Sequence, residues 1–229
     1  MIVLGLDASS DSAAVGIVKD GVLLCEQTIH NGKNHSLTLL PAVETLLGEV
    51  GLSFENIDVY ACGIGPGSFT GVRIGAATLK GFAQAWDKPV VALSSLQILA
   101  ENIRDFDGLR VSAIHARTDE LFCAAYDADG NEVMAPQVMT IAEFLEALKG
   151  KNCKIVGNGA AVFAGEMEEV LGKDSLAHAG WTHIIRGGAV AELGYQFASG
   201  GKTISCAELA PSYLRVSQAE REYQEKQHN

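Results

Sequence analysis

Apolar and polar positions along the chain follow two periods, and the elements they predict come in a regular order. In the first half, short apolar runs separated by turn residues indicate strands, and apolar residues at helical spacing indicate helices. The predicted elements are strands at 2–7, 13–19 and 22–28, a helix at 34–50, a strand at 57–64, a helix at 72–86, a strand at 90–93 and a helix from 94 to about 103.

The second half predicts nearly the same order without any visible sequence repeat. Its expected elements are strands at 110–116, 121–127 and 132–134, a helix at 141–148, a strand at 153–157, and helices near 160–171 and 188–198. We therefore expect two similar α/β units, at 1–104 and 105–216, with the option that the helix near 188–199 packs back on the first unit. The polar segment 217–229 is expected to be a tail.

Composition narrows the class of protein. With 17 Lys+Arg against 28 Asp+Glu, the formal charge is −11, which disfavours direct nucleic-acid binding. The negative charge is uneven, because no Asp or Glu lies between Glu26 and Glu44 or between Asp58 and Asp87. Five cysteines without a CxxC pair, and no apolar run of membrane-spanning length, predict a cytoplasmic protein with reduced thiols and no membrane partner.

A glycine-rich loop before the predicted helix at 72–86 is the most unusual segment. Free N–H groups at a helix N-terminus attract anions, and glycines allow close backbone approach. The loop matches neither the Walker pattern nor the dinucleotide GxGxxG pattern, so a tight structural turn is the alternative to an anion site. The candidate anion-binding residues here are Gly65, Gly67, Ser68, Thr70 and Gly71.

The end of the first predicted strand carries the next candidate site. Asp7 is followed by Ser9 and Ser10 at a predicted hairpin, which is where nucleotide-binding sheets hold phosphate and metal. The alternative is that Asp7 forms an Asx turn into the hairpin. His178 and His183 are five residues apart and so lie on different faces of a helix, and no metal site or catalytic residue is predicted.

The predicted helix at 72–86 is apolar on two sides, which indicates burial on both. One side would cover its own sheet, and the other would meet either a further layer of this chain or a partner; we favour a partner. Arg73 would form an ion pair or meet an anion at the loop. One stripe is formed by Val72, Gly75, Ala76, Leu79, Ala83 and Trp86, and the other by Ile74, Ala77, Gly81, Phe82 and Ala85.

Several short motifs are spread along the chain in a fixed order. They are LDASS at 6–10, NHS at 34–36 followed by Leu40-Pro41, GPGSFTGVRIG at 65–75, SSL at 94–96, Ala116-Arg117 with Glu120, GNGA at 157–160, and PxYLR at 211–215. Together they resemble the TsaB (YeaZ) family of the bacterial threonylcarbamoyladenosine (t6A) tRNA-modification system. The resemblance covers nearly the whole chain and implies the α/β fold of the actin/Hsp70/sugar-kinase (ASKHA) superfamily, with two ribonuclease-H-like subdomains.

The resemblance also implies a role. The related transferase, TsaD, holds its metal partly through an HxxxH motif, and here the aligned stretch runs from His35 to Leu39, which cannot bind metal. The chain is thus expected to be a noncatalytic subunit that pairs with a TsaD-type transferase and a TsaE-type ATPase, meets tRNA indirectly, and forms a homodimer when the partner is absent.

The resemblance implies that the chain contacts the TsaD-type transferase through its first two helices. No intrinsic cofactor is expected, and ATP or ADP with Mg²⁺ would bind only at the interface with partners. The expected partner-binding residues are Leu37, Leu40, Val72, Arg73, Gly75, Ala76, Leu79, Lys80 and Ala83.

Two departures from the family pattern bear on the alternatives. His115 stands where Asp is common before Ala116-Arg117, and Asn158 stands where Asp is frequent. Both changes remove carboxylates from places that a metal–nucleotide complex would need. An independent ATPase or phosphotransferase of the ASKHA type remains the alternative function, and a peptidase, which lacks both metal ligands and a nucleophile elbow, is the weaker one.

Overall fold

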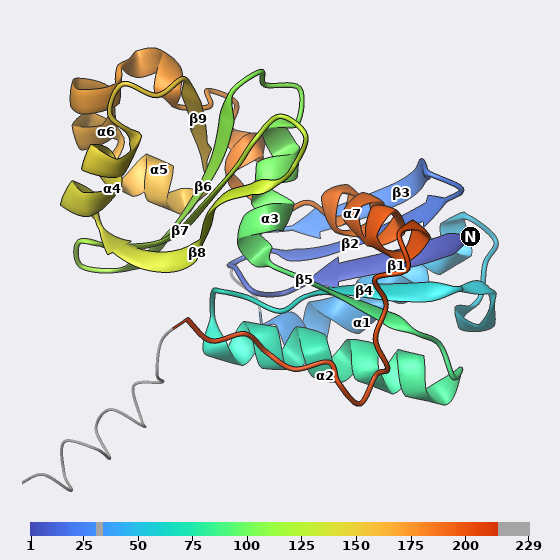
Figure 1. The fold of residues 1–229 in the computed structure, drawn as a ribbon. Coiled ribbons are helices and arrows are strands. Elements are labelled where there is room, and N and C mark those ends of the chain that lie inside the picture. Colours follow the sequence, from blue (N-terminus) through green and yellow to red (C-terminus); the bar gives the residue numbers. More distant parts are fainter. Residues whose placement is uncertain (31–33, 215–229) are drawn as a thin grey trace, which may run out of the picture.

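The first sheet is built mainly from the amino-terminal part of the chain. The structure, a computed structural model, describes residues 1–30 and 34–214. The strands β1 (Ile2–Asp7), β2 (Ala13–Lys19), β3 (Val22–Ile29), β4 (Val59–Gly63) and β5 (Val90–Leu93) form it, in the order β3-β2-β1-β4-β5. The first three strands are antiparallel, and β4 and β5 run parallel to β1 (Figure 1).

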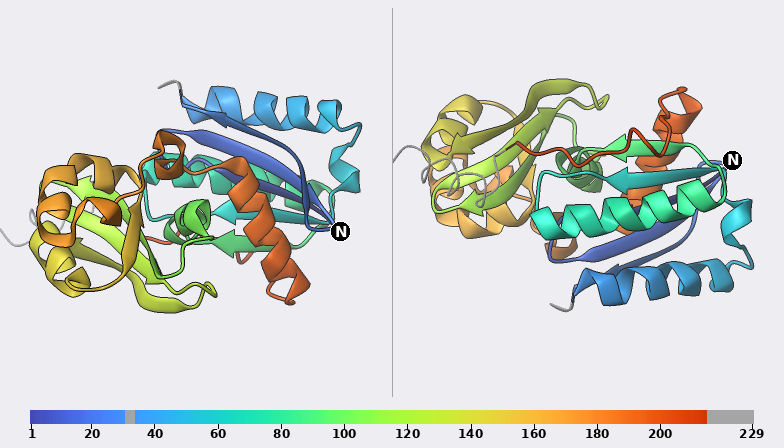
Figure 2. Two further views of the ribbon diagram at one scale, coloured as in Figure 1. Left: turned by 90° about the horizontal axis from the view of Figure 1, so that it is seen from above. Right: turned by 90° about the horizontal axis from the view of Figure 1, so that it is seen from below.

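Helices cover both faces of this sheet. The helices α1 (His35–Glu49) and α2 (Phe69–Ala85) lie side by side on one face, and α7 (Gly187–Ser199) lies on the other (Figure 2). Successive residues of β1 face opposite layers, so Leu4 packs under α1 and α2 while Val3 packs under α7. A Cβ on Gly16 would lie only 2.3 Å from the carbonyl oxygen of Gly187, and this lack of side chains lets α7 approach the sheet closely.

The second sheet repeats the topology with fewer strands. The strands β6 (Leu109–Arg117), β7 (Glu120–Tyr126), β8 (Glu132–Thr140) and β9 (Cys153–Val156) have the order β8-β7-β6-β9. One face carries α4 (Ile141–Leu148), α5 (Asn158–Val162) and α6 (Ala164–Leu171), and α3 (Ser95–Ala100) packs on the other. Short 3₁₀ turns lie at Phe54–Asn56, Glu101–Ile103, Lys173–Ser175 and Gly180–His183.

The predicted fold class and repeated element order are confirmed, with corrections at particular elements. The single helix expected near 160–171 is two helices separated at Phe163, and the strand expected at 132–134 extends to Thr140. In the described part of the chain the second sheet has four strands and no counterpart of β5. The expected tail at 217–229 lies outside the described residues.

The boundary expected for the second unit, 105–216, also needs correction. The option that the helix near 188–199 packs back on the first unit is observed, since α7 covers one face of the first sheet. The following residues also return: Ile204 pairs with Val90 at the β5 edge, and Leu209 is buried in the core under α1 and α2. Physically, β5 and that core would otherwise be open to water along one edge. The second unit therefore ends near residue 186.

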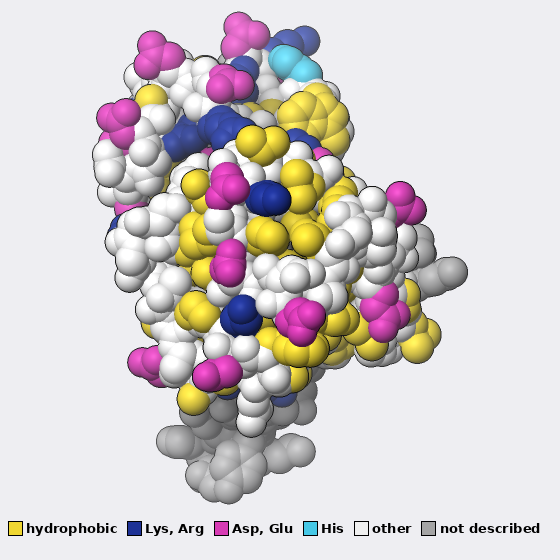
Figure 3. Space-filling view, turned by 90° about the vertical axis from the view of Figure 1, so that its right-hand side faces the viewer, with side chains coloured by type: hydrophobic (Ala, Val, Ile, Leu, Met, Phe, Trp, Pro, Cys, Tyr) yellow, Lys and Arg dark blue, Asp and Glu magenta, His cyan; other side chains and the backbone are white. Residues whose placement is uncertain are grey.

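Charged side chains are dispersed over the end of the molecule that carries the N-terminus. Figure 3 shows acidic groups spread around this face, with Lys and Arg side chains and hydrophobic side chains lying between them. The net charge of −11 is therefore not gathered into a single acidic field on this face.

Candidate functional site

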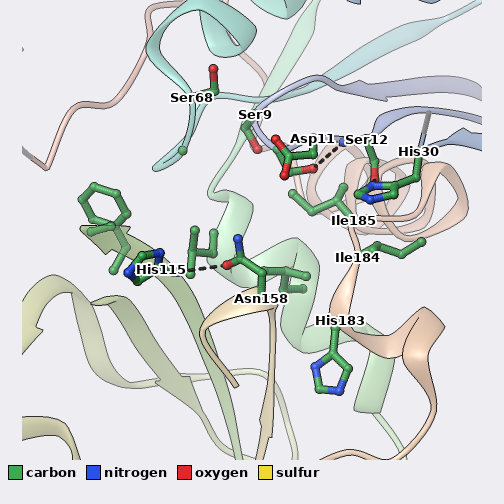
Figure 4. A pocket seen from close by; sticks show the side chains of 16 residues that line it. Ser9, Asp11, Ser12, His30, Ser68, His115, Asn158, His183, Ile184 and Ile185 are labelled. Atoms are coloured by element: carbon green, nitrogen blue, oxygen red, sulfur yellow. Dashed lines mark hydrogen bonds between the residues drawn. The ribbon is translucent and has the colours of Figure 1, made fainter. Parts of the chain in front are cut away.

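A cleft of about 280 Å³ separates the two units. Its first wall is the turn between β1 and β2 together with Gly67 and Ser68, and its second wall is the end of β6 with Asn158 (Figure 4). Ile184 and Ile185, in the segment that returns to the first unit, line one side. The cleft thus lies where the corresponding hairpins of the two units oppose each other.

The cleft contains few charges. Its described lining includes one carboxylate, Asp11, and three histidines, and it includes neither Lys nor Arg. The Ser12 hydroxyl lies 2.9 Å from Nδ1 of His30, and the His115 N–H donates to the Asn158 side-chain oxygen at 2.9 Å. Phosphate binding relies on cations or a row of free N–H groups, so this lining offers little to neutralise a polyphosphate.

Asp7, expected at an open phosphate or metal site, is completely buried beside the cleft and does not line it. Its Oδ1 accepts hydrogen bonds from the Ser9 N–H (2.8 Å) and hydroxyl (2.9 Å), and the Ser95 hydroxyl lies 3.5 Å from Oδ2. Loss of hydration raises the pKa of Asp7 to about 6, and the hydrogen bonds from Ser9 and Ser95 offset part of that rise. Asp7 therefore forms the Asx turn into the hairpin that was the alternative to an open phosphate or metal site.

The glycine-rich loop packs on the same hairpin, backbone against backbone. A Cβ on Gly67 would lie 2.1 Å from the Ser9 carbonyl oxygen, and one on Gly71 would lie 1.9 Å from that of Ala8. The Ser68 N–H donates to the Ser9 carbonyl at 2.7 Å, and the Ser68 hydroxyl caps α2 by accepting from the Gly71 N–H. The Ser68 N–H and hydroxyl thus bond within the chain, and close backbone packing explains why Gly67 and Gly71 are glycines, as the tight-turn alternative expects. Anion binding at this loop stays a prediction.

The apolar stripe expected to face a partner instead faces the chain's own sheet. All five small or apolar members named as partner-binding residues are buried, because α2 sits directly on β1 and β4; they are Val72, Gly75, Ala76, Leu79 and Ala83. A partner cannot reach these positions while α2 is packed on the sheet. This corrects the expected orientation of α2: of the other stripe, Ala77, Gly81 and Ala85 are exposed, while Ile74 and Phe82 pack against the core.

The outer face of α1 and α2 exposes apolar and small residues among polar ones such as Glu44 and Gln84. On α1, Leu37 is 72% exposed and Leu40 is 42% exposed, as the partner prediction requires. On α2, Ala77 and Gly81 are exposed, and a side chain added at Gly81 would meet nothing within 4 Å. We call these four residues the α1–α2 face; its small residues on α2 leave room for close approach of another helix.

The two cations expected in the partner contact are engaged by the last described segment of the chain. The Arg73 guanidinium donates through Nε to the Tyr213 hydroxyl at 2.8 Å, and the guanidinium carbon, Cζ, lies 5.6 Å from the centre of the Tyr213 ring. Nζ of Lys80 donates to the Ala207 carbonyl at 3.4 Å. Both side chains thus border the α1–α2 face while holding the carboxyl-terminal segment against α2.

The histidine that begins the HxxxH-like stretch is used within the chain. Nε2 of His35 lies 2.8 Å from the Ser10 carbonyl oxygen, which ties the start of α1 to the cleft hairpin. Leu39, at the place of the second histidine, is buried in the core. In the described residues, no group of three or more His, Cys, Asp or Glu side chains is placed to hold a metal ion.

Two contacts near the cleft were not predicted from the sequence. Ser95 is buried and donates to the Ser9 hydroxyl at 2.8 Å, which links α3 to Asp7 and the first hairpin. Tyr213, quoted only as part of a motif, stacks on Phe69 with ring centres 4.7 Å apart. The SSL and PxYLR motifs contained both residues, but only the fold brings them to their partners.

Two tandem units with this strand order, opposed across a cleft lined by their hairpins, define an actin/Hsp70/sugar-kinase-type protein of the ribonuclease-H-like α/β class. A family model described as TsaD, tRNA N6-adenosine threonylcarbamoyltransferase, matches residues 24–223. The chain is 30% identical to the tRNA threonylcarbamoyladenosine biosynthesis protein TsaB of Bacillus subtilis, over 99% of this chain and 100% of that protein. It belongs to the TsaB (YeaZ) family of t6A biosynthesis in tRNA, as the motifs indicated.

Further similar proteins belong to the same TsaB (YeaZ) family. The TsaB protein of Escherichia coli is 28% identical over 94% of this chain and 95% of its own length. The solved structure of YeaZ from Pseudomonas aeruginosa is similar with a TM-score of 0.75 and 27% identity, covering 93% of this chain and 99% of that one. Among the described residues, no helix combines the length and apolar character that crossing a membrane requires.

Proposed function

We propose that this chain is a noncatalytic scaffold subunit that pairs with a TsaD-type transferase through the α1–α2 face and thereby supports t6A formation at adenine 37 of tRNA. The observation that carries the proposal is the exposed Leu37 and Leu40 beside the small residues of α2. A contiguous apolar patch on a folded surface marks a protein contact, whereas single exposed apolar residues are common. The absence of Asp and Glu from 27–43 and 59–86 keeps carboxylates out of the first turns of α1 and out of all of α2, while Glu44 and Glu49 lie further along α1.

A TsaE-type ATPase would join at the junction of the two proteins, and tRNA would be met through the transferase. The acidic balance of the whole chain supports indirect contact with tRNA, because a net charge of −11 opposes a polyphosphate backbone. Without its partner, the chain would pair with a second copy through the same face.

The nucleotide is part of the same proposal. ATP or ADP with Mg²⁺ would bind only where partner residues complete a site, since Asp7 is enclosed and the cleft lining lacks Lys and Arg among the described residues. Isothermal titration of the isolated chain with Mg-ATP should give no binding heat. A saturable heat with one site per chain would instead favour the independent ATPase.

The direct test is reconstitution. We expect size-exclusion chromatography with the TsaD-type transferase and ATP to give a shared peak, and t6A formation on tRNA to need this chain along with transferase and ATPase. Leu37→Glu should abolish the shared peak, while Val133→Glu, a matched change at an exposed apolar residue of the second unit, should preserve it. Separate elution of the wild-type proteins would reject the scaffold proposal.

A further inference from the structure

The last described residues, Pro211–Leu214, cross from one unit to the other. The Ser212 N–H donates to the Ile64 carbonyl at 2.8 Å, which fastens the segment to the end of β4 in the first unit. Tyr213 then stacks on Phe69 at the start of α2, with the ring planes only 20° apart. Both of these contacts are with the first unit.

The next residue reaches the second unit. Leu214 packs against a cluster on the face of the second sheet that α3 covers. The buried members of that cluster are Leu96, Ala100, Phe122, Ala124 and Tyr126. A small hollow lined by Pro66, Gly67 and Phe69 from the first unit and Phe122 from the second lies directly beneath Tyr213 and Leu214. The segment therefore spans the junction between the units at the side of the cleft that carries the glycine-rich loop.

Arg73 connects this crossing to the outer surface of α2. Its guanidinium both donates to the Tyr213 hydroxyl and lies against the Tyr213 ring. Arg73 is itself exposed, on the side of α2 away from the sheet. A protein that docks on α2 with an acidic side chain near Arg73 would compete with Tyr213 for the same cation.

We propose that Pro211–Leu214 is a latch that holds the second unit closed against the first and, resting on the proposed function, that an acidic side chain of the TsaD-type transferase docked on the outer face of α2 loosens the latch through Arg73. The segment belongs to no helix or strand, and Tyr213 is 43% exposed, so the latch opens more easily than the sheets unfold. Opening the latch removes the contacts of Tyr213 and Leu214 at the junction and so loosens the two hairpins that line the cleft, while α3 stays packed on β6 and β7. Docking on α2 and the width of the cleft are then linked through Tyr213.

Hydrogen exchange in the full chain tests the latch. In Tyr213→Ala and in Leu214→Ser, we expect amides of Ser95–Ala100 and Ile114–Phe122 to exchange about 10-fold faster, since loss of a stacked aromatic pair or of a partly buried leucine contact shifts the opening equilibrium by about that factor. Amides of β2 should keep their wild-type rates, which separates opening of the junction from global unfolding. Val133→Ser removes an exposed apolar side chain from the second unit and should leave all rates unchanged.

Milder changes address the role of Arg73 without risking the fold. Arg73→Lys keeps the positive charge but loses the planar contact with the ring, and Tyr213→Phe keeps the stack but loses the hydroxyl. Both should accelerate exchange at the junction by a smaller factor than Tyr213→Ala. Wild-type exchange at the junction in Tyr213→Ala and Leu214→Ser would overturn the latch, and wild-type exchange in Arg73→Lys alone would overturn the link to α2.

Discussion

Replacing Asp7 by Asn tests how the enclosed carboxylate affects stability. The side chain is completely buried at the end of β1, held by the Ser9 N–H and by the hydroxyls of Ser9 and Ser95. Asn keeps the size of the group and an acceptor oxygen for Ser9, but it carries no charge. The substitution therefore removes the ionisation while leaving most of the packing in place.

The magnitude follows from the pKa of Asp7, which burial raises from 3.8 to about 6. At about 1.4 kcal/mol per pKa unit, the folded protein binds this proton more tightly than the unfolded chain by roughly 3 kcal/mol. That contribution to stability is complete below the unfolded pKa and is lost as the pH rises through the folded pKa. Wild type should therefore lose roughly 3 kcal/mol relative to Asp7→Asn between pH 3 and pH 8, most of it between pH 4 and pH 7.

Urea unfolding of both proteins at several pH values gives the required difference. Taking the difference between two variants removes the contributions of other carboxylates, such as Glu143, whose pKa is lowered by hydrogen bonds from Thr140. Asp11→Asn, which removes an exposed carboxylate from the same turn, controls for the loss of one negative charge. A difference between wild type and Asp7→Asn that stays constant with pH, or that grows in favour of wild type as pH rises, would refute the reasoning.

Two further predictions concern packing. Gly71→Ala should lower the free energy of unfolding in urea by about 3 kcal/mol, because the new Cβ would overlap the Ala8 carbonyl oxygen, whereas Gly48→Ala, in open space on α1, should raise it by roughly 0.5–1 kcal/mol; equal effects would contradict the packing of the loop. Leu79→Ala should cost about 3 kcal/mol in the same assay because Leu79 is fully buried, and Leu37→Ala should change stability by less than about 0.5 kcal/mol. A large loss from Leu37→Ala would place that residue in the core.

The sequence was sufficient for most of the architecture. Strands such as β5 and helices such as α4 were predicted at their observed bounds, since apolar periodicity and turn residues act locally. The duplicated order pointed to two units before any comparison. The return of residues 201–214 to the first sheet was missed, because Ile204 and Leu209 are isolated apolar positions whose partners lie far away in the chain.

The candidate site was harder to read for the same physical reason. Both stripes of α2 are apolar or small, so periodicity could not decide which one faces β1 and β4. The enclosure of Asp7 depends on Ser95, 88 residues away, and the engagement of Arg73 depends on Tyr213, 140 residues away. Contacts at such separations leave no local pattern, and Leu37 was expected to bind a partner only because the family resemblance implied a contact through the first two helices.

The affinity of this chain for the TsaD-type transferase, measured by isothermal titration in the presence of ATP, tests the central claim most directly. The exposed Leu37 side chain should contribute about 2 kcal/mol when buried, so Leu37→Glu should weaken binding by roughly 30-fold or more. Val133→Glu should bind like wild type. Equal affinity of Leu37→Glu and wild type would contradict docking through the α1–α2 face.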